Sequence, residues 1–102
     1  MNADDEALQA LFRSSTPGVP HRVLHYIYFP EKKAAELAAN QLDKVEFSIE
    51  IRLGADGKNW LVLIAHTIVP TSKSIADVRA LMTGITERLG GEYDGWEAEV
   101  TS

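Results

Sequence analysis

The chain has 102 residues, of which 45% are hydrophobic and 25% are charged, values typical of one globular domain. It contains no cysteine, which excludes disulfides, thiolate metal sites and cysteine nucleophiles. The net charge of -5 argues against a nucleic-acid-binding surface, because the ten basic residues are scattered among fifteen acidic ones. The acidic start from Met1 to Glu6 lacks the basic and apolar regions of a secretory signal, and no apolar run is long enough to span a membrane. We therefore expect a single cytoplasmic domain over residues 1–102.

The first half of the chain predicts a short helix, a strand and a second helix. Asn2 suits a helix cap, and apolar residues at helical spacing predict an N-terminal helix over about residues 3–14. The Pro- and Gly-containing residues 16–20 break it. Residues 21–29 are rich in β-branched and aromatic side chains and are apolar on both faces, which is typical of a central strand. An alanine-rich helix is expected from residue 31 to about 43, beginning after Pro30.

The second half predicts a hairpin, a long helix and a closing strand. Residues 45–53 alternate between apolar and polar, which indicates an edge strand with one buried face. Asp56-Gly57 is hairpin-turn chemistry, and residues 60–69 form a second apolar strand. Ser72 or Ser74 then caps a helix that ends at Gly90, and a strand follows from residue 92 to about 100.

This order predicts an α+β fold of the ferredoxin-like class. A β-α-β-β-α-β core over about residues 21–100 gives a four-stranded antiparallel sheet with two helices on one face, here preceded by the N-terminal helix. The two apolar strands are expected at the centre of the sheet.

No residue pattern in the sequence indicates catalysis, a cofactor or a metal site. The spacing Gly54-x-x-Gly57-Lys58 is too short for a phosphate-binding loop, and no helix follows it. His25 and His66 can meet if their strands are neighbours, but no third ligand is spaced to join them. The serines fall in loops and helix caps, where none is expected beside a general base. We expect hydrogen-bonded structural histidines and no enzyme.

Aromatic residues mark one strand as a contact surface. Tyr26 and Tyr28 share a face, which raises the possibility of base stacking, but residues 60–66 lack the basic, Gly- and Phe-rich motif of an RNA-recognition sheet. A sheet face with two tyrosines and little charge is more often covered by a protein. We name His25, Tyr26 and Tyr28 as possible contacts on this face.

The C-terminal segment carries the most specific signal. Glu92, Tyr93, Asp94, Gly95 and Trp96 follow the last helix, and the same string ends the helix of the regulator of ribonuclease E activity B (RraB) family, which the chain also resembles in the order of its segments. The resemblance covers about nine-tenths of the chain, in a short form without the family's long acidic tail. It implies a ferredoxin-like domain without catalytic activity that binds ribonuclease E and lowers RNA turnover.

Two interpretations of the molecular function therefore remain open. The first is a non-enzymatic regulatory domain with a protein partner, in which the five motif residues either contact the partner or have a structural role. The second is a self-associating structural or small-ligand module, such as a homodimer that buries the face around Tyr26 and Tyr28. The acids at 92, 94, 97 and 99 form an acidic edge that is either solvated or used for docking.

Overall fold

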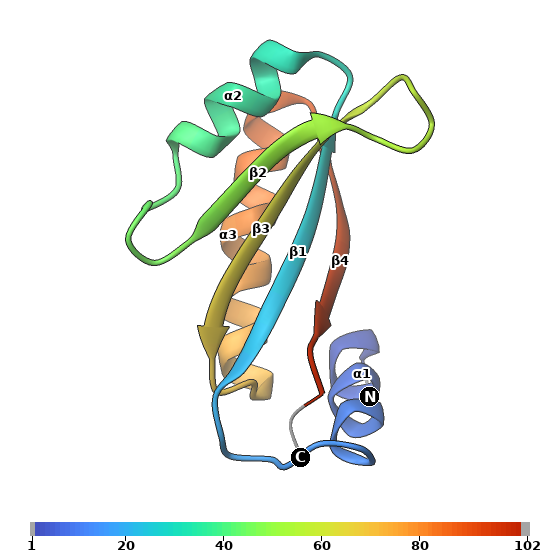
Figure 1. The fold of residues 1–102 in the computed structure, drawn as a ribbon, viewed down its shortest axis with the longest axis vertical. Coiled ribbons are helices and arrows are strands. Elements are labelled where there is room, and N and C mark those ends of the chain that lie inside the picture. The colour runs from blue at the N-terminus through green and yellow to red at the C-terminus, as the bar shows by residue number, and fades with distance from the viewer. Residues whose placement is uncertain (1, 101–102) are drawn as a thin grey trace.

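The protein folds into a four-stranded antiparallel sheet with three helices, in a computed structural model that describes residues 2–100 (Figure 1). The elements are α1 (Ala3–Phe12), β1 (His21–Phe29), α2 (Lys32–Asn40), β2 (Ser48–Leu53), β3 (Trp60–Ile68), α3 (Ser72–Leu89) and β4 (Glu92–Ala98). From β1 onward their order is β-α-β-β-α-β, and the leading α1 makes the complete order differ from a strict ferredoxin-like one. The domain expected over residues 1–102 includes Met1, Thr101 and Ser102, which lie outside the described residues.

The sheet places its two apolar strands at the centre, as their composition predicts. The strand order is β2-β3-β1-β4, and each neighbouring pair is antiparallel. β1 and β3 pair along their whole length, from His21 opposite Ile68 to Phe29 opposite Trp60. The alternating β2 lies at one edge, as expected, and β4 lies at the other.

One face of the sheet carries the hydrophobic core. Side chains alternate between the two faces of a strand, and the odd-numbered residues of β1 are the buried ones. They pack with β3 against α2 and α3, which both contact β1 and each other. The members of this core are Ile27, Phe29, Ala35, Ala38, Leu42, Phe47, Val62, Ile64, Val78, Met82 and Ile85. The buried alanines of α2 allow the helix to approach the sheet closely.

A smaller cluster attaches α1 to the same side of the molecule. Leu8 of α1 packs with Val23 of β1 and Ile75 of α3, and the indole of Trp96 lies against them. Figure 1 shows α1 beside the C-terminal end of β4. Among residues 2–100, no helix has the length and apolar character needed to cross a membrane.

Local hydrogen bonds shift several boundaries that the sequence predicts. β2 begins at Ser48 instead of residue 45, because residues 43–47 form a turn in which Asp43 accepts hydrogen bonds from the backbone N–H groups of Val45 and Phe47. α3 is capped by Thr71 instead of Ser72 or Ser74, and the Ser74 side chain completes a reciprocal capping box. Gly90 ends α3 in the left-handed conformation, as predicted.

Candidate functional site

The segment Glu92–Ala98 directs alternate side chains to opposite faces of the sheet. Tyr93 lies opposite Ile27 and Trp96 opposite His25, both on the helix-covered side. These partners are two residues apart on β1 but three apart on β4, so the pairing contains a bulge. Gly95 occupies it with φ +99°, a conformation that L-residues with a side chain rarely adopt. The bulge is what allows both aromatic side chains to point inward.

Trp96 and Arg79 converge on a single carboxylate in α1. The indole Nε1 of Trp96 donates to Asp4 Oδ1 at 3.0 Å. Arg79 of α3 donates to both carboxylate oxygens of Asp4, at 2.6 and 2.7 Å. The hydrogen bond from Arg79, with a further contribution from that of Trp96, lowers the pKa of Asp4 against the opposing effect of burial. The contacts explain why a tryptophan lies so near the end of the chain.

Tyr93 begins a row of hydrogen-bonded polar side chains that runs across neighbouring strands on the helix-covered face of the sheet. Its hydroxyl is hydrogen-bonded to His25 Nδ1 at 3.0 Å, and His25 Nε2 lies 2.9 Å from Nε2 of His66. Arg79 stacks over the Tyr93 ring at 5.0 Å from its centroid. Burial raises the pKa of Tyr93 to about 12. Burial first, and then the nearby charges of His66 and Arg79, lowers the pKa of His25 to about 3. Burial also lowers the pKa of His66, so desolvation favours the neutral form of both rings.

The two histidines meet, as the sequence allows, but in a structural arrangement. The two facing nitrogens lie 2.9 Å apart in a hydrogen bond, and a metal site built from protein side chains needs at least one further ligand. Within residues 2–100, no three His, Cys, Asp or Glu side chains group as metal ligands. The ring of His66 also lies against that of Phe47, with centroids 4.9 Å apart and the ring planes tilted by 36°.

The structure also contains a hydrogen-bonded serine–histidine pair that the sequence did not indicate. Ser15 lies in the loop between α1 and β1, and His21 is the first residue of β1. Ser15 Oγ and His21 Nε2 are 2.9 Å apart, and His21 Nδ1 lies at the same distance from the backbone carbonyl of Val19. Both side chains are buried, with 8% and 1% exposure. The buried hydrogen bonds of this pair fasten the loop between α1 and β1.

The opposite face of the sheet carries Tyr26 and Tyr28 but not His25. Consecutive strand residues point to opposite faces, so His25 lies on the helix-covered side and is fully buried. The tyrosines lie beside Leu24 and Leu63, which are half-buried, and Leu61, which is buried. No helix of residues 2–100 lies on this side of the sheet (Figure 1). The Tyr26 hydroxyl donates a short hydrogen bond to Glu97 of β4, which raises the pKa of Tyr26 to about 12. We call this surface the open face.

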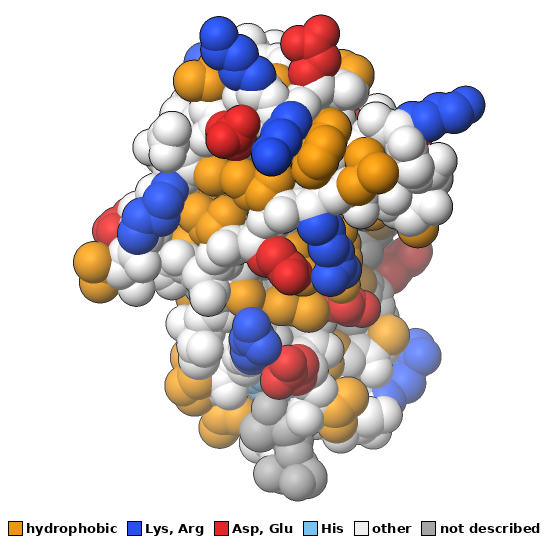
Figure 2. All heavy atoms as spheres, turned by 45° about the horizontal axis from the view of Figure 1, so that its top comes forward, with side chains coloured by type: hydrophobic (Ala, Val, Ile, Leu, Met, Phe, Trp, Pro, Cys, Tyr) orange, Lys and Arg blue, Asp and Glu red, His pale blue; other side chains and the backbone are white. Residues whose placement is uncertain are grey.

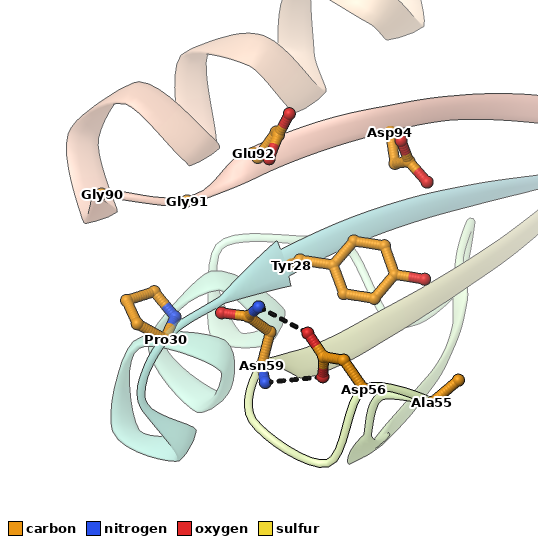
Figure 3. Close-up of a pocket in the computed structure, with 9 residues that line it drawn as sticks. All are labelled: Tyr28, Pro30, Ala55, Asp56, Asn59, Gly90, Gly91, Glu92 and Asp94. Atoms are coloured by element: carbon orange, nitrogen blue, oxygen red, sulfur yellow. Dashed lines mark hydrogen bonds between the residues drawn. The ribbon is translucent and has the colours of Figure 1, made fainter.

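A polar hollow lies at the end of the open face. Its volume is about 500 Å³. The lining residues are Tyr28, Pro30, Ala55, Asp56, Asn59, Gly90, Gly91, Glu92 and Asp94. The Tyr28 ring lies between the carboxylates of Asp56 and Asp94 (Figure 3). Backbone N–H groups of Lys58 and Asn59 and the side-chain amide of Asn59 donate to Asp56 and lower its pKa.

The five motif residues thus have two kinds of environment. Tyr93 and Trp96 are half-buried and hydrogen-bonded to other elements, and Gly95 forms the bulge between them. Glu92 and Asp94 are exposed and line the hollow. The sequence identified these five positions, but it did not indicate that Asp4, Arg79 and Asp56 join them, because those residues are distant along the chain.

Comparison with known proteins agrees with this motif. No individual curated protein matches the chain. The family model described as RraB, Regulator of ribonuclease activity B, matches residues 2–98. The match extends from α1 to the end of β4 and includes every element described above. The chain therefore belongs to the RraB family of ribonuclease regulators.

Proposed function

We propose that this chain is a non-enzymatic regulatory domain that binds ribonuclease E and lowers RNA turnover. The observation that carries the proposal is the family match, which covers residues 2–98 and therefore every helix and strand of the fold. A partner of this kind implies action in the cytoplasm.

The chemistry of the described residues supports a role without catalysis. Three of the groups with shifted pKa values, His25, Tyr93 and Asp4, form hydrogen bonds that connect different elements of the fold. The hollow offers carboxylates and a phenol but no paired nucleophile and base among its lining residues. The mechanism we infer is binding alone: the domain alters the enzyme by occupying a surface of it.

The charge of the chain supports a protein partner over RNA. The open face carries acidic side chains along β4, and phosphate groups would be repelled there. We therefore infer that the domain changes RNA turnover through the enzyme and not through direct contact with RNA.

The test is capture followed by an assay of activity. The chain, immobilised on beads, is exposed to a bacterial lysate and the retained ribonuclease E is compared with a bead control. Purified ribonuclease E is then assayed for RNA cleavage with and without the domain. We expect enrichment and slower cleavage; a folded chain that neither retains the enzyme nor changes its rate contradicts the proposal.

The open face also favours a second candidate, a self-associating module. Its tyrosines and leucines form an apolar surface that another copy of the chain could cover. Light scattering over a range of concentrations separates the two candidates, because a stable homodimer would bury the face that a heterologous partner needs.

A further inference from the structure

We propose that the open face and the polar hollow at its end bind a basic, apolar-containing segment of a protein partner. Apolar side chains of the segment lie on the centre of the sheet, and an arginine or lysine head enters the hollow. The identity of the partner as ribonuclease E rests on the function proposed above, whereas the chemistry of the segment rests on the face itself.

The centre of the open face carries half-buried apolar side chains from Leu24, Tyr26, Tyr28 and Leu63, whereas Leu61 and Ala65 between them are buried. Tyr26 of β1 lies opposite Leu63 of β3, and Tyr28 lies opposite Leu61 in the next outward-facing pair. Leu24 and Ala65 form a third such pair. Figure 2 shows hydrophobic side chains on this side of the molecule with charged side chains of both signs among them. An uncovered surface of this kind is typical of a binding site for a protein.

Acidic side chains outnumber basic ones around this surface. Two pairs are already neutralised: Arg22 with Glu99 at 3.5 Å, and Arg52 with Glu50 at 3.3 Å. Glu92 lies opposite Tyr28 and Glu97 opposite Leu24, so β4 adds carboxylates directly beside the apolar rows. None of the ion pairs formed by residues 2–100 involves Glu92 or Asp94. The uncompensated charge is complementary to a cationic partner.

The hollow has the composition that an arginine or lysine head requires. Asp56, Glu92 and Asp94 contribute carboxylates to one space, and the ring of Tyr28 lies between Asp56 and Asp94 (Figure 3). A guanidinium group pairs with carboxylates and also stacks on aromatic faces. The volume of about 500 Å³ accommodates such a head with surrounding water.

The same charges disfavour other occupants. A second copy of the chain would bring its own acidic β4 and an overall charge of -5 to the interface. Juxtaposed like charges oppose association, and RNA phosphates would meet the same repulsion. A basic protein segment that also carries apolar side chains is complementary both to the apolar centre of the open face and to the carboxylates that line the hollow.

The test compares two charge reversals of equal size on different faces. The double variant E92K/D94K reverses the rim of the hollow. The double variant E36K/E87K reverses two exposed acids on α2 and α3, the helices that cover the other face. Binding of each variant to purified ribonuclease E is measured by titration, with thermal melting as the check on folding. We expect E92K/D94K to weaken binding at least about tenfold and E36K/E87K to change it by less than about threefold.

If ribonuclease E binds the unmodified chain, the titrations of the two double variants decide this inference. If both double variants bind as the unmodified chain does, or if only E36K/E87K loses binding, the domain is a ligand of the enzyme but the open face is not its docking surface. That outcome overturns this inference and leaves the proposed function intact.

A second probe decides the inference if the enzyme does not bind at all. The isotope-labelled chain is mixed with a synthetic peptide that alternates leucine with arginine, and with a control that alternates leucine with glutamate. Amide shifts caused only by the arginine peptide, confined to β1, β3, β4 and the hollow and lost in E92K/D94K, support the basic-segment site although the proposed function has failed. Shifts elsewhere, equal shifts from both peptides or no shifts overturn it.

Discussion

Asp4 is the residue at which three elements of the fold meet. Its carboxylate belongs to α1 and accepts hydrogen bonds from Arg79 of α3 and Trp96 of β4. A charge-assisted pair is stronger when it is partly shielded from water, and the Asp4 side chain is only 14% exposed. Asp4 therefore does more than balance the dipole of its own helix, which is the role that its position in the sequence indicates.

The first prediction concerns the contact between Trp96 and Asp4. We expect Trp96→Phe to lower the free energy of unfolding by about 1 kcal/mol, because most of the apolar contact remains and one hydrogen bond is lost. Urea unfolding of this variant, of Asp4→Ala and of the double variant completes a mutant cycle. Purely additive effects, with a coupling below about 0.3 kcal/mol, would show that the indole does not depend on Asp4.

The second prediction separates the two adjacent glycines after α3. A Cβ on Gly91 would lie 2.4 Å from the ring of Phe29 and 2.6 Å from the carbonyl oxygen of Tyr28. Gly90 has φ +74° with open space around it. We expect Gly91→Ala to cost about 3 kcal/mol through overpacking, and Gly90→Ala about 1 kcal/mol through its backbone conformation.

Urea unfolding of these two alanine variants checks the difference. A loss of stability at Gly91 no larger than that at Gly90 would mean that Phe29 and the backbone of Tyr28 adjust at little cost, and it would contradict the prediction.

At the scale of elements, buried imidazoles connect the strands. His25 of β1 is hydrogen-bonded to His66 of β3 and to Tyr93 of β4, so one polar chain crosses three strands of the sheet. Hydrogen-bonded polar groups in a core favour one register, because a slip would leave them buried without partners. The sequence indicated that these two histidines could meet, but only the pairing of β1 with β3 places their rings on the same face.

The third prediction is a loss of stability in acid that originates in these histidines. The folded pKa of His25, about 3, lies below its ordinary value of 6.5, and burial lowers that of His66 as well. Between about pH 3 and pH 6.5 the unfolded chain binds more protons at His25 than the folded chain does. The contribution of His25 to the free energy of unfolding is therefore fully present above about pH 6.5 and decreases as the pH falls. At pH 5 the loss from His25 alone is on the order of 2 kcal/mol.

Urea unfolding at several pH values measures this loss, and NMR titration reports the protonation of each ring. The variant His25→Gln/His66→Gln is expected to be less stable at neutral pH and to show a flatter dependence between pH 7 and pH 5. A His25 ring that becomes protonated near its ordinary pKa in the folded chain would contradict the prediction.

At the scale of the whole molecule, the two faces of the sheet have different roles. α2 and α3 cover one face and α1 packs against α3 on the same side, so the hydrophobic core and the polar network lie there. The other face keeps its tyrosines and leucines beside the acidic β4. The fourth prediction follows from this division: the chain is a monomer, because its open face is apolar at the centre but surrounded by like charge.

Light scattering at low and high protein concentration checks the oligomeric state. We expect the mass of one chain throughout, and we expect association to increase when the rim is neutralised in the variant Glu92→Gln/Asp94→Gln. A homodimer in the unmodified chain that dissociates on substitution of Leu63 by a charged residue would support self-association through the open face.

The sequence by itself determined the order of the elements, the central position of the two apolar strands and the family motif. These properties depend on local periodicity, composition and neighbouring residues, which a linear chain displays directly. The tertiary structure decided that His25 faces away from Tyr26 and Tyr28, that Ser15 binds His21, and that Asp4 receives Arg79 and Trp96. It also decided that Asp56 joins Glu92 and Asp94 in one hollow. Contacts between residues far apart in the chain depend on how the strands pair and on which side the helices pack, and no local pattern in the sequence specifies that geometry.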